Sequence, residues 1–387
     1  MREPLQTPGA RAWRYWLAIL AVAMPVQMSV TASPFINGLA MDTRQAASET
    51  IGLIRSCEIL LNASLMIWLS ARLVHFAPKV LALAGLTGFI VGNLICGVSN
   101  DLTGLAAGRL LAGAGAGAMV ASLGAFVGRL ASPHRAAALI AIPVTGGAIV
   151  TALLASAAAD AKSSLGLFGL LATGGSLGLL LMAAAPGGFF HAAHSPPFRS
   201  MLRALRSPFV IACATIFMGS TAVWHFFQRI GLSHGLDNAA IGTLTVQVSL
   251  ACALLAPAAA LVRDAWVRWT FIGSLIGFGA GSTLIPLAPD AHVYAAGYLL
   301  QSAAFTFYTL FVAAVAARLD RTGGIAAAGN GWQALGGAIS PAIGGMLISG
   351  GAFLPLAVFC ALASLATVTL GVIGTKDLAP TGAREKS

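Results

Sequence analysis

The chain has 387 residues, of which 58% are hydrophobic and only 9% are charged, and its mean hydropathy is +0.86. This small number of polar residues cannot cover the surface of a soluble protein of this length. Most of the chain is therefore expected to lie in lipid. A formal charge of +10 would suggest nucleic-acid binding in a soluble protein. Here the basic residues lie between apolar runs, and no nucleic-acid partner is expected.

Twelve apolar segments, each near the length of a membrane-spanning helix, follow one another along the chain. They cover residues 15–38, 49–71, 79–99, 102–128, 136–159, 164–186, 208–230, 239–262, 266–287, 291–316, 324–349 and 352–374. The connections between them are too short to fold alone. We therefore predict an all-α membrane protein with twelve transmembrane helices.

The first segment is longer than the apolar part of a usual signal peptide and has no clear cleavage site, so we expect a retained helix. With the N-terminus in the cytoplasm, nearly all Lys and Arg residues fall on the cytoplasmic side, and only Arg44 and Lys162 fall clearly in outer loops. This asymmetry predicts that both termini are cytoplasmic. We expect an integral, multi-pass protein of a bacterial inner (plasma) membrane.

An internal repeat relates the two halves of the chain. The sequence AAGRLLAG at 106–113 recurs as AAGYLLQS at 295–302, and the Arg129-Leu130 pair recurs at Arg318-Leu319, both with an offset of 189 residues. The repeat predicts two parallel six-helix halves, at 1–186 and 208–387, joined by a cytoplasmic connection at 187–207.

These features resemble the major facilitator superfamily (MFS) of secondary transporters. The resemblance rests on the twelve spans, the parallel repeats, the basic connection HAAHSPPFRSMLRALRSP at 191–208, and RLLAGAGAG from Arg109, which is similar to the family's fourth-helix motif. NGWQALGGAISPAIGG at 330–345 is similar to its eleventh helix. Two segments depart from the family: SARLVHFAPKVL lacks the aspartate of its usual loop signature, and TALLASAAAD lacks the proline of many exporters, which weakens an antiporter assignment.

The glycine-rich stretch of the fourth segment is bounded by apolar runs and is not expected to be a phosphate-binding loop. Gly104, Gly108, Gly113 and Gly117 provide small residues through which helices approach closely in lipid. Arg109 would lie ~10 Å inside the span, where an unpaired cation is costly, so it must face a cavity or a partner.

Glu58 is the only acid well inside a span, and Arg55, Glu58 and Asn62 form one polar stripe on the second helix. One interpretation is a structural Arg55–Glu58 pair. The other is a proton-coupling site at Glu58, in which burial disfavours the charged carboxylate and Arg55 or Arg109 favours it.

Polar and aromatic residues on five spans predict the wall of a substrate cavity at the interface of the halves. The candidate substrate-binding residues are Gln27, Thr31, Asn62, Arg109, Trp224, Gln228, Tyr298, Gln301, Phe305 and Tyr308. Aromatic stripes are also common in packing, but buried Gln27 and Gln301 need hydrogen-bond partners.

Other chemistry is not indicated. His191 and His194 lack the companions of a metal site, the five cysteines lack metal-ligand spacing, and His225 and Arg229 are expected near the outer membrane interface. We find no catalytic set and expect neither an enzyme nor a cofactor.

The favoured function is secondary transport of a small-molecule substrate, coupled to H+, by a monomer in the lipid bilayer. Uptake and efflux are both open. The alternative is an MFS-fold sensor or membrane-embedded enzyme without transport.

Overall fold

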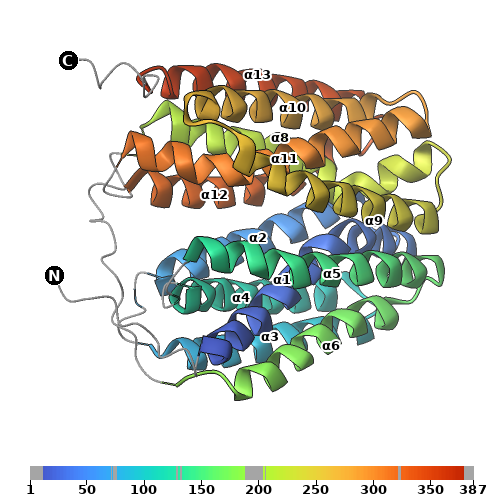
Figure 1. The fold of residues 1–387 in the computed structure, drawn as a ribbon. Helices are drawn as coiled ribbons and strands as arrows, with labels where there is room; N and C mark the ends of the chain where they lie inside the picture. Colours follow the sequence, from blue (N-terminus) through green and yellow to red (C-terminus); the bar gives the residue numbers. More distant parts are fainter. Residues whose placement is uncertain are drawn as a thin grey trace, which may run out of the picture. The chain divides into compact units, whose positions relative to one another are not determined.

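The computed structural model describes residues 12–70, 72, 76–127, 130, 133–187, 204, 206–320 and 324–378. The described part of the chain forms twelve α-helices (Figure 1). The first six are α1 Ala12–Thr43, α2 Ser48–Ser70, α3 Pro78–Val98, α4 Leu102–Val127, α5 Pro133–Asp160 and α6 Ser164–Ala183. The others are α8 Pro208–Ser233, α9 Asn238–Leu255, α10 Val267–Leu287, α11 Ala291–Leu319, α12 Gly324–Leu347 and α13 Leu354–Gly374.

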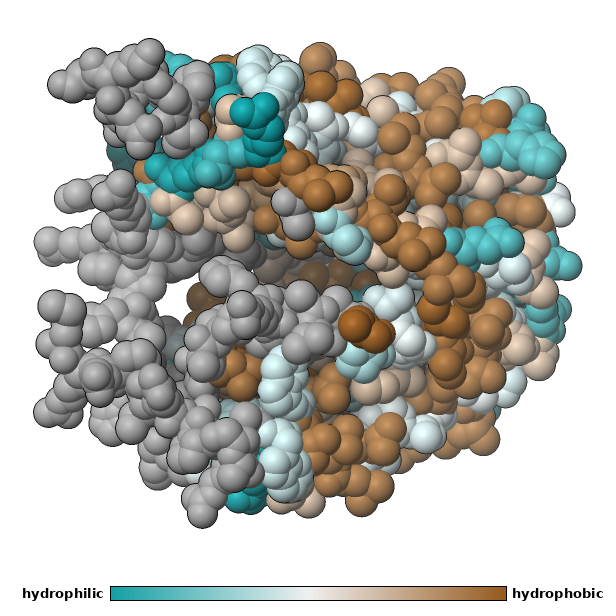
Figure 2. Space-filling view, viewed as in Figure 1, coloured by the Kyte–Doolittle hydropathy of each residue, from teal (hydrophilic) through white to brown (hydrophobic). Residues whose placement is uncertain are grey.

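The helices confirm the predicted all-α fold class, and each one overlaps a predicted span. Eleven of them are long and apolar enough to cross a membrane. The other helix, α12, carries Asn330, Gln333 and several glycines, which lower its hydropathy. The chain is thus an integral, multi-pass membrane protein, and Figure 2 shows hydrophobic residues over much of the described surface in view.

Capping residues and prolines set several helix ends. Ser163, Asp237 and Asp290 precede α6, α9 and α11, and their side chains accept hydrogen bonds from backbone N–H groups of the first turn. Pro78 and Pro208 occupy the first turns of α3 and α8, where a missing N–H costs no helical bond. Within the predicted span 239–262, the candidate membrane span covers Asn238–Ala259. The α-helix α9 ends at Leu255 and a 3₁₀ helix, Ala256–Leu261, follows, where Pro257 lacks the N–H of an α-helical bond.

The helices group into two compact units. Unit 1 comprises Met1–Ala46 and Cys57–Ser195, and unit 2 comprises Ala47–Ser56 and Pro196–Ser387. The first residues of α2 therefore pack with unit 2 and the rest of that helix with unit 1. In unit 1, α4 packs closely on α3, and in unit 2, α11 packs closely on α10.

The internal repeat appears in this packing. Both α4 and α11 begin at positions separated by the predicted offset, Leu102 and Ala291. A Cβ atom added to Gly92 of α3 would lie 2.6 Å from the carbonyl oxygen of Gly108, and one added to Gly281 of α10 would lie 2.7 Å from that of Gly297. Equivalent glycines thus allow equivalent close helix contacts in the two units. The helices that begin the two repeats, α1 and α8, are also the two most buried spans.

Candidate functional site

Arg109 lies inside unit 1, on α4, and is only 1% exposed. Its Nη1 lies 3.4 Å from Oε1 of Glu58 on α2. Its Nη2 donates to Oδ1 of Asn93 on α3 at 2.5 Å, and its Nε donates to Sγ of Cys96 at 3.3 Å. Three nitrogens of the guanidinium therefore have partners on two neighbouring helices.

Further contacts hold these partners in place. The Asn93 amide donates from Nδ2 to the carbonyl oxygen of Phe89 at 2.8 Å, which orients Oδ1 toward Arg109. The Phe168 ring of α6 lies 5.1 Å from the Arg109 guanidinium carbon and adds a cation–π contact. Of the two environments predicted for Arg109, a cavity or a partner, the structure provides partners.

Glycines bring the helix backbones close around this ion pair. A Cβ atom added to Gly113 would lie 2.6 Å from the carbonyl oxygen of Glu58 and 2.8 Å from its Cγ. A Cβ atom on Gly117 would lie 2.6 Å from the carbonyl oxygen of Asn62. The absence of side chains at these two positions is what allows the backbone of α4 to lie against α2 at Glu58.

The four glycines of α4 that were predicted to allow close helix approach face different neighbours. Gly113 and Gly117 face α2, whereas Gly108 faces Cys96 and Gly92 of α3. Gly104 faces Ser99 and Asp101, just before its own helix. The separation follows from helix geometry, because the step of five residues from Gly108 to Gly113 turns the backbone to another face.

Arg55 has a partner that the sequence analysis missed. Its Nη2 lies 3.5 Å from Nε2 of His225 on α8, within unit 2. His225 is 3% exposed, so its side chain is enclosed by protein atoms. Its Nδ1 lies 2.9 Å from the carbonyl oxygen of Thr221 and donates to it, which leaves Nε2 as an acceptor for Arg55 and makes the imidazole neutral. The signal was its position one helical turn after Thr221, on the polar face of α8.

The candidate substrate residues of unit 1 lie on α1 and α2. Gln27 donates from Nε2 to the hydroxyl of Thr31 one turn later, at 3.4 Å. Thr31 is 4% exposed, and Asn62 is half-buried beside Gly117. Gln27 therefore finds its partner on its own helix.

Two of the predicted aromatic residues in unit 2 come together. The rings of Trp224 and Tyr298 stack with centroids 6.0 Å apart, and Phe227 lies 4.4 Å from Tyr298. Gln228 donates from Nε2 to Oδ1 of Asn238 at 2.6 Å, a contact between α8 and α9. This part of unit 2 is an aromatic stack beside a hydrogen-bonded amide pair.

A second aromatic group lies further along α11. Phe305 and Tyr308 each lie 6.1 Å from Phe217 of α8, measured between ring centroids. Gln333 of α12 donates to the Tyr308 hydroxyl, a contact that was not predicted from the sequence. Phe305 is 37% exposed, so this group presents an aromatic face.

Gln301, the predicted amide of α11, donates from Nε2 to the Ser282 hydroxyl of α10 at 3.0 Å. Ser282 occupies the position that is equivalent to Asn93 in the repeat, so the two units use the same position to accept a bond from the neighbouring helix. His191 and His194 lie outside the described residues. Among the described residues, no group of three metal-binding side chains occurs.

The solved structures that resemble this arrangement of helices are MFS-fold transporters, and the likeness establishes the fold of the chain. No protein-family profile matches the sequence. A comparison with curated proteins finds no match.

Solved structures of transporters share this fold along nearly the whole chain. A bacterial homologue of the human lysosomal transporter Spinster, inward-facing and unoccupied, has 12% sequence identity and a TM-score of 0.69 and covers 96% of each chain. A POT family transporter in complex with a thioalcohol-conjugated peptide has 14% identity and a TM-score of 0.71, covering 93% of this chain and 95% of its own. A POT family transporter in complex with 5-aminolevulinic acid has 14% identity, a TM-score of 0.70 and 95% coverage of both chains. At these identities the likeness establishes the fold.

Proposed function

We propose that the protein is a secondary active transporter that moves a small organic solute by alternating access, coupled to protons. The observation that carries this proposal is the match to transporters over at least 93% of the chain. The buried contact between Glu58 and Arg109 supports the coupling, because an ionisable pair inside a membrane protein is costly and is usually functional.

We propose Glu58 as the proton-binding group. A proton on Glu58 removes the negative charge that faces Arg109, while Asn93 and Cys96 still hold the guanidinium. Gly113 keeps the α4 backbone against Glu58, so a change in this carboxyl acts directly on the packing of α2 against α4. Protonation is thereby linked to helix packing, as alternating access requires.

Arg55 is the third proposed coupling residue. It lies on the same face of α2 as Glu58, and it faces the neutral imidazole of His225. For substrate contact we propose the residues that each unit offers separately. They are Gln27, Thr31 and Asn62 in unit 1, and Trp224, Gln228, Tyr298, Gln301, Phe305 and Tyr308 in unit 2. Because Arg109 is enclosed by protein partners, we assign it to coupling ahead of direct substrate contact.

The proposal includes the membrane and the topology. We propose a monomer in a bacterial inner membrane with both termini in the cytoplasm. Its two six-helix bundles cover 1–186 and 208–387, and a cytoplasmic connection covers 187–207. The excess of Lys and Arg in connections on one side supports this orientation.

The test begins with a ligand. Purified protein is heated with a panel of organic acids, amino acids, sugars and aromatic cations, because a ligand stabilises the state that it binds. The best stabiliser is then offered to liposomes that contain the protein under an imposed pH gradient. We expect solute accumulation that follows the gradient.

The variant Glu58→Gln should lose gradient-driven accumulation but keep ligand binding, since the amide keeps the shape and cannot exchange a proton. Glu49→Gln, the same change near the start of α2, is the matched control and should transport normally. Normal pH-driven transport by Glu58→Gln would refute the coupling role. Binding without any solute movement by the wild-type protein would refute transport and favour the sensor.

A further inference from the structure

Unit 1 contains an apolar groove between α1, α5 and α6, with a volume of about 380 Å³. Met24 and Met28 line it from α1, Gly146 and Val150 from α5, and Leu177 from α6. Among the described residues that line it, only Thr173 carries a polar side chain. The groove therefore suits a hydrocarbon ligand.

The groove lies within membrane-spanning segments and is open at its side. Its lining residues belong to the spans Trp13–Thr43, Ile142–Asp160 and Ser164–Ala183. Val150 is 53% exposed and Leu177 is 47% exposed, as expected for residues that face lipid. An opening of this kind in the hydrocarbon layer is accessible to a lipid acyl chain.

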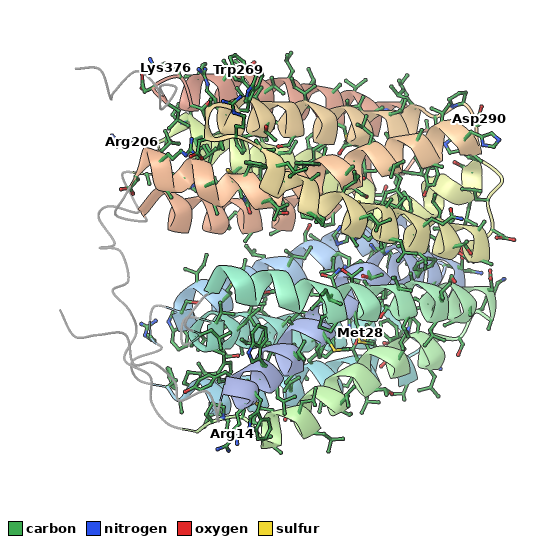
Figure 3. All side chains as sticks on the ribbon, viewed as in Figure 1. Arg14, Met28, Arg206, Trp269, Asp290 and Lys376 are labelled. Atoms are coloured by element: carbon green, nitrogen blue, oxygen red, sulfur yellow. The ribbon has the colours of Figure 1, made fainter. Side chains whose placement is uncertain are left out.

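Glycines shape the groove from two helices. On one side, Met24 lies 3.5 Å from the position of a Cβ atom on Gly147, and Met28, labelled in Figure 3, lies against Gly174. A Cβ atom added to Gly146 would meet nothing within 4 Å. The space beside Gly146 is therefore not occupied by described protein atoms.

Two cations lie at the end of α6 that follows the groove. Lys79 donates from Nζ to the carbonyl oxygens of Ala183 and Ala185 at 3.0 Å each, and Arg14 donates from Nε to that of Ala184 at 2.8 Å. Ala184 lies about one helical turn beyond Leu181, the last groove residue of α6. Arg14 makes its bond to the described residues through Nε, so its two terminal nitrogens can donate to another acceptor.

Aromatic residues place Arg14 at the level of lipid headgroups. Trp13, Tyr15 and Trp16 surround it in the sequence, and Trp13 is 54% exposed. Trp and Tyr concentrate at membrane–water interfaces, because their rings are apolar and their N–H and O–H groups are polar. Figure 3 shows Arg14 near the start of α1 and Met28 further along the same helix.

We propose that this groove binds one anionic phospholipid, with an acyl chain beside Gly146 and its phosphate on Arg14 and Lys79. The two cations also cap the carbonyl end of α6, and a bound phosphate would complete their coordination. The site is separate from the proposed coupling residues and does not depend on transport.

The headgroup is tested by titrating delipidated protein in detergent with dioleoylphosphatidylglycerol or dioleoylphosphatidylcholine and counting retained lipids by native mass spectrometry. The two lipids carry the same acyl chains and differ in headgroup charge. We expect one phosphatidylglycerol to be retained about tenfold more tightly than phosphatidylcholine, from two basic contacts. Arg14→Gln with Lys79→Gln should abolish this preference and leave phosphatidylcholine binding unchanged. Equal binding of the two lipids by the wild-type protein would overturn the proposal.

The acyl-chain site is tested with Gly146→Leu, which adds a side chain at a lining position where a Cβ atom would meet nothing within 4 Å. Retention of both lipids should fall about tenfold, because the new side chain displaces buried methylenes. The matched control is Gly169→Leu in α6, where an added Cβ atom also meets nothing within 4 Å and which does not line the groove. It should bind like the wild type.

Unchanged lipid binding by Gly146→Leu would overturn the acyl-chain assignment. If the wild-type protein is a dimer that retains no lipid and Gly146→Leu is a monomer, a second copy of the chain fills the groove. That result would also overturn the acyl-chain assignment. Both variants are first checked for a single, monodisperse peak in size-exclusion chromatography. The comparison of the two lipids on the wild-type protein decides the outcome even if a variant fails to fold.

Discussion

The contact between α4 and α2 can be tested with one substitution at two glycines of the same helix. A Cβ atom on Gly113 would lie 2.6 Å from the Glu58 carbonyl oxygen, whereas one on Gly124 would meet nothing within 4 Å. Gly113→Ala and Gly124→Ala therefore add the same methyl group to α4, once into a closed contact and once into open space.

The size of the effect follows from the geometry. Ordinary contact begins near 3.4 Å, so Gly113→Ala requires α2 to move by roughly 0.8 Å at Glu58. The Arg109–Glu58 contact is already 3.4 Å long, so such a shift takes it beyond hydrogen-bond distance. Overpacking costs about 1–3 kcal/mol, and weakening a buried ion pair adds to it, whereas the gain in helix propensity is at most about 1 kcal/mol. We expect a net loss of about 2 kcal/mol.

Gly124→Ala should keep only the gain in helix propensity and be neutral or stabilised by up to about 1 kcal/mol. The measurement is the apparent midpoint of thermal unfolding in detergent, compared at one heating rate because unfolding of such proteins is often irreversible. The midpoint should fall for Gly113→Ala and stay or rise for Gly124→Ala. Equal midpoints for the two variants would refute the close contact at Glu58.

Three other predictions follow from the ion pair, a helix cap and the topology. Arg109→Ala leaves Glu58 buried without its cation and should lower the free energy of unfolding by about 3–5 kcal/mol. Arg109→Leu combined with Glu58→Leu should recover much of the thermal stability. An equal loss of stability in the single and the double variant would contradict the pairing. Backbone hydrogen bonds from Val293, and also from His292, lower the pKa of Asp290, so its capping contribution is present above the usual aspartate pKa and is lost as pH falls through the lowered value. Asp290→Asn should remove this part of the pH dependence of the unfolding midpoint, and an unchanged acid-side slope would argue against the cap. Single cysteines at Ser195 and Ser349 should be labelled from opposite sides of the membrane, since an odd number of spans separates them, and labelling from one side would exclude the predicted topology.

Charged and aromatic residues of unit 2 lie toward the two ends of its helices. Figure 3 shows Arg206, Trp269 and Lys376 toward one end of its helices and Asp290 toward the other. Arg268 lies 5.1 Å from the Trp269 ring, a cation–aromatic contact of the kind found at the headgroup level. The cytoplasmic position of the basic end stays a prediction from the positive-inside rule.

The helices could be predicted from the sequence alone because the properties that locate a membrane-spanning helix belong to its own segment. A spanning segment must satisfy its own backbone hydrogen bonds, so length and hydropathy suffice to locate it. The predicted start of the fourth segment, Leu102, is the start of α4, and the offset of the repeat places the start of α11 correctly. The change from α-helix to 3₁₀ helix beside Pro257 was not predicted, and it ends α9 before the predicted end of that span.

The partners of the polar residues depended on tertiary packing. Glu58 and Arg55 lie three residues apart on α2, but the structure brings Glu58 to Arg109, 51 residues away, and Arg55 to His225, 170 residues away. Hydropathy and periodicity report how apolar a helix face is, and they do not report which other helix that face meets. The glycines determine which helices meet, since Gly113 and Gly108 lie on one helix and face two different neighbours. In lipid, close backbone approach through small residues decides helix pairing, and its geometry exists only in the folded chain.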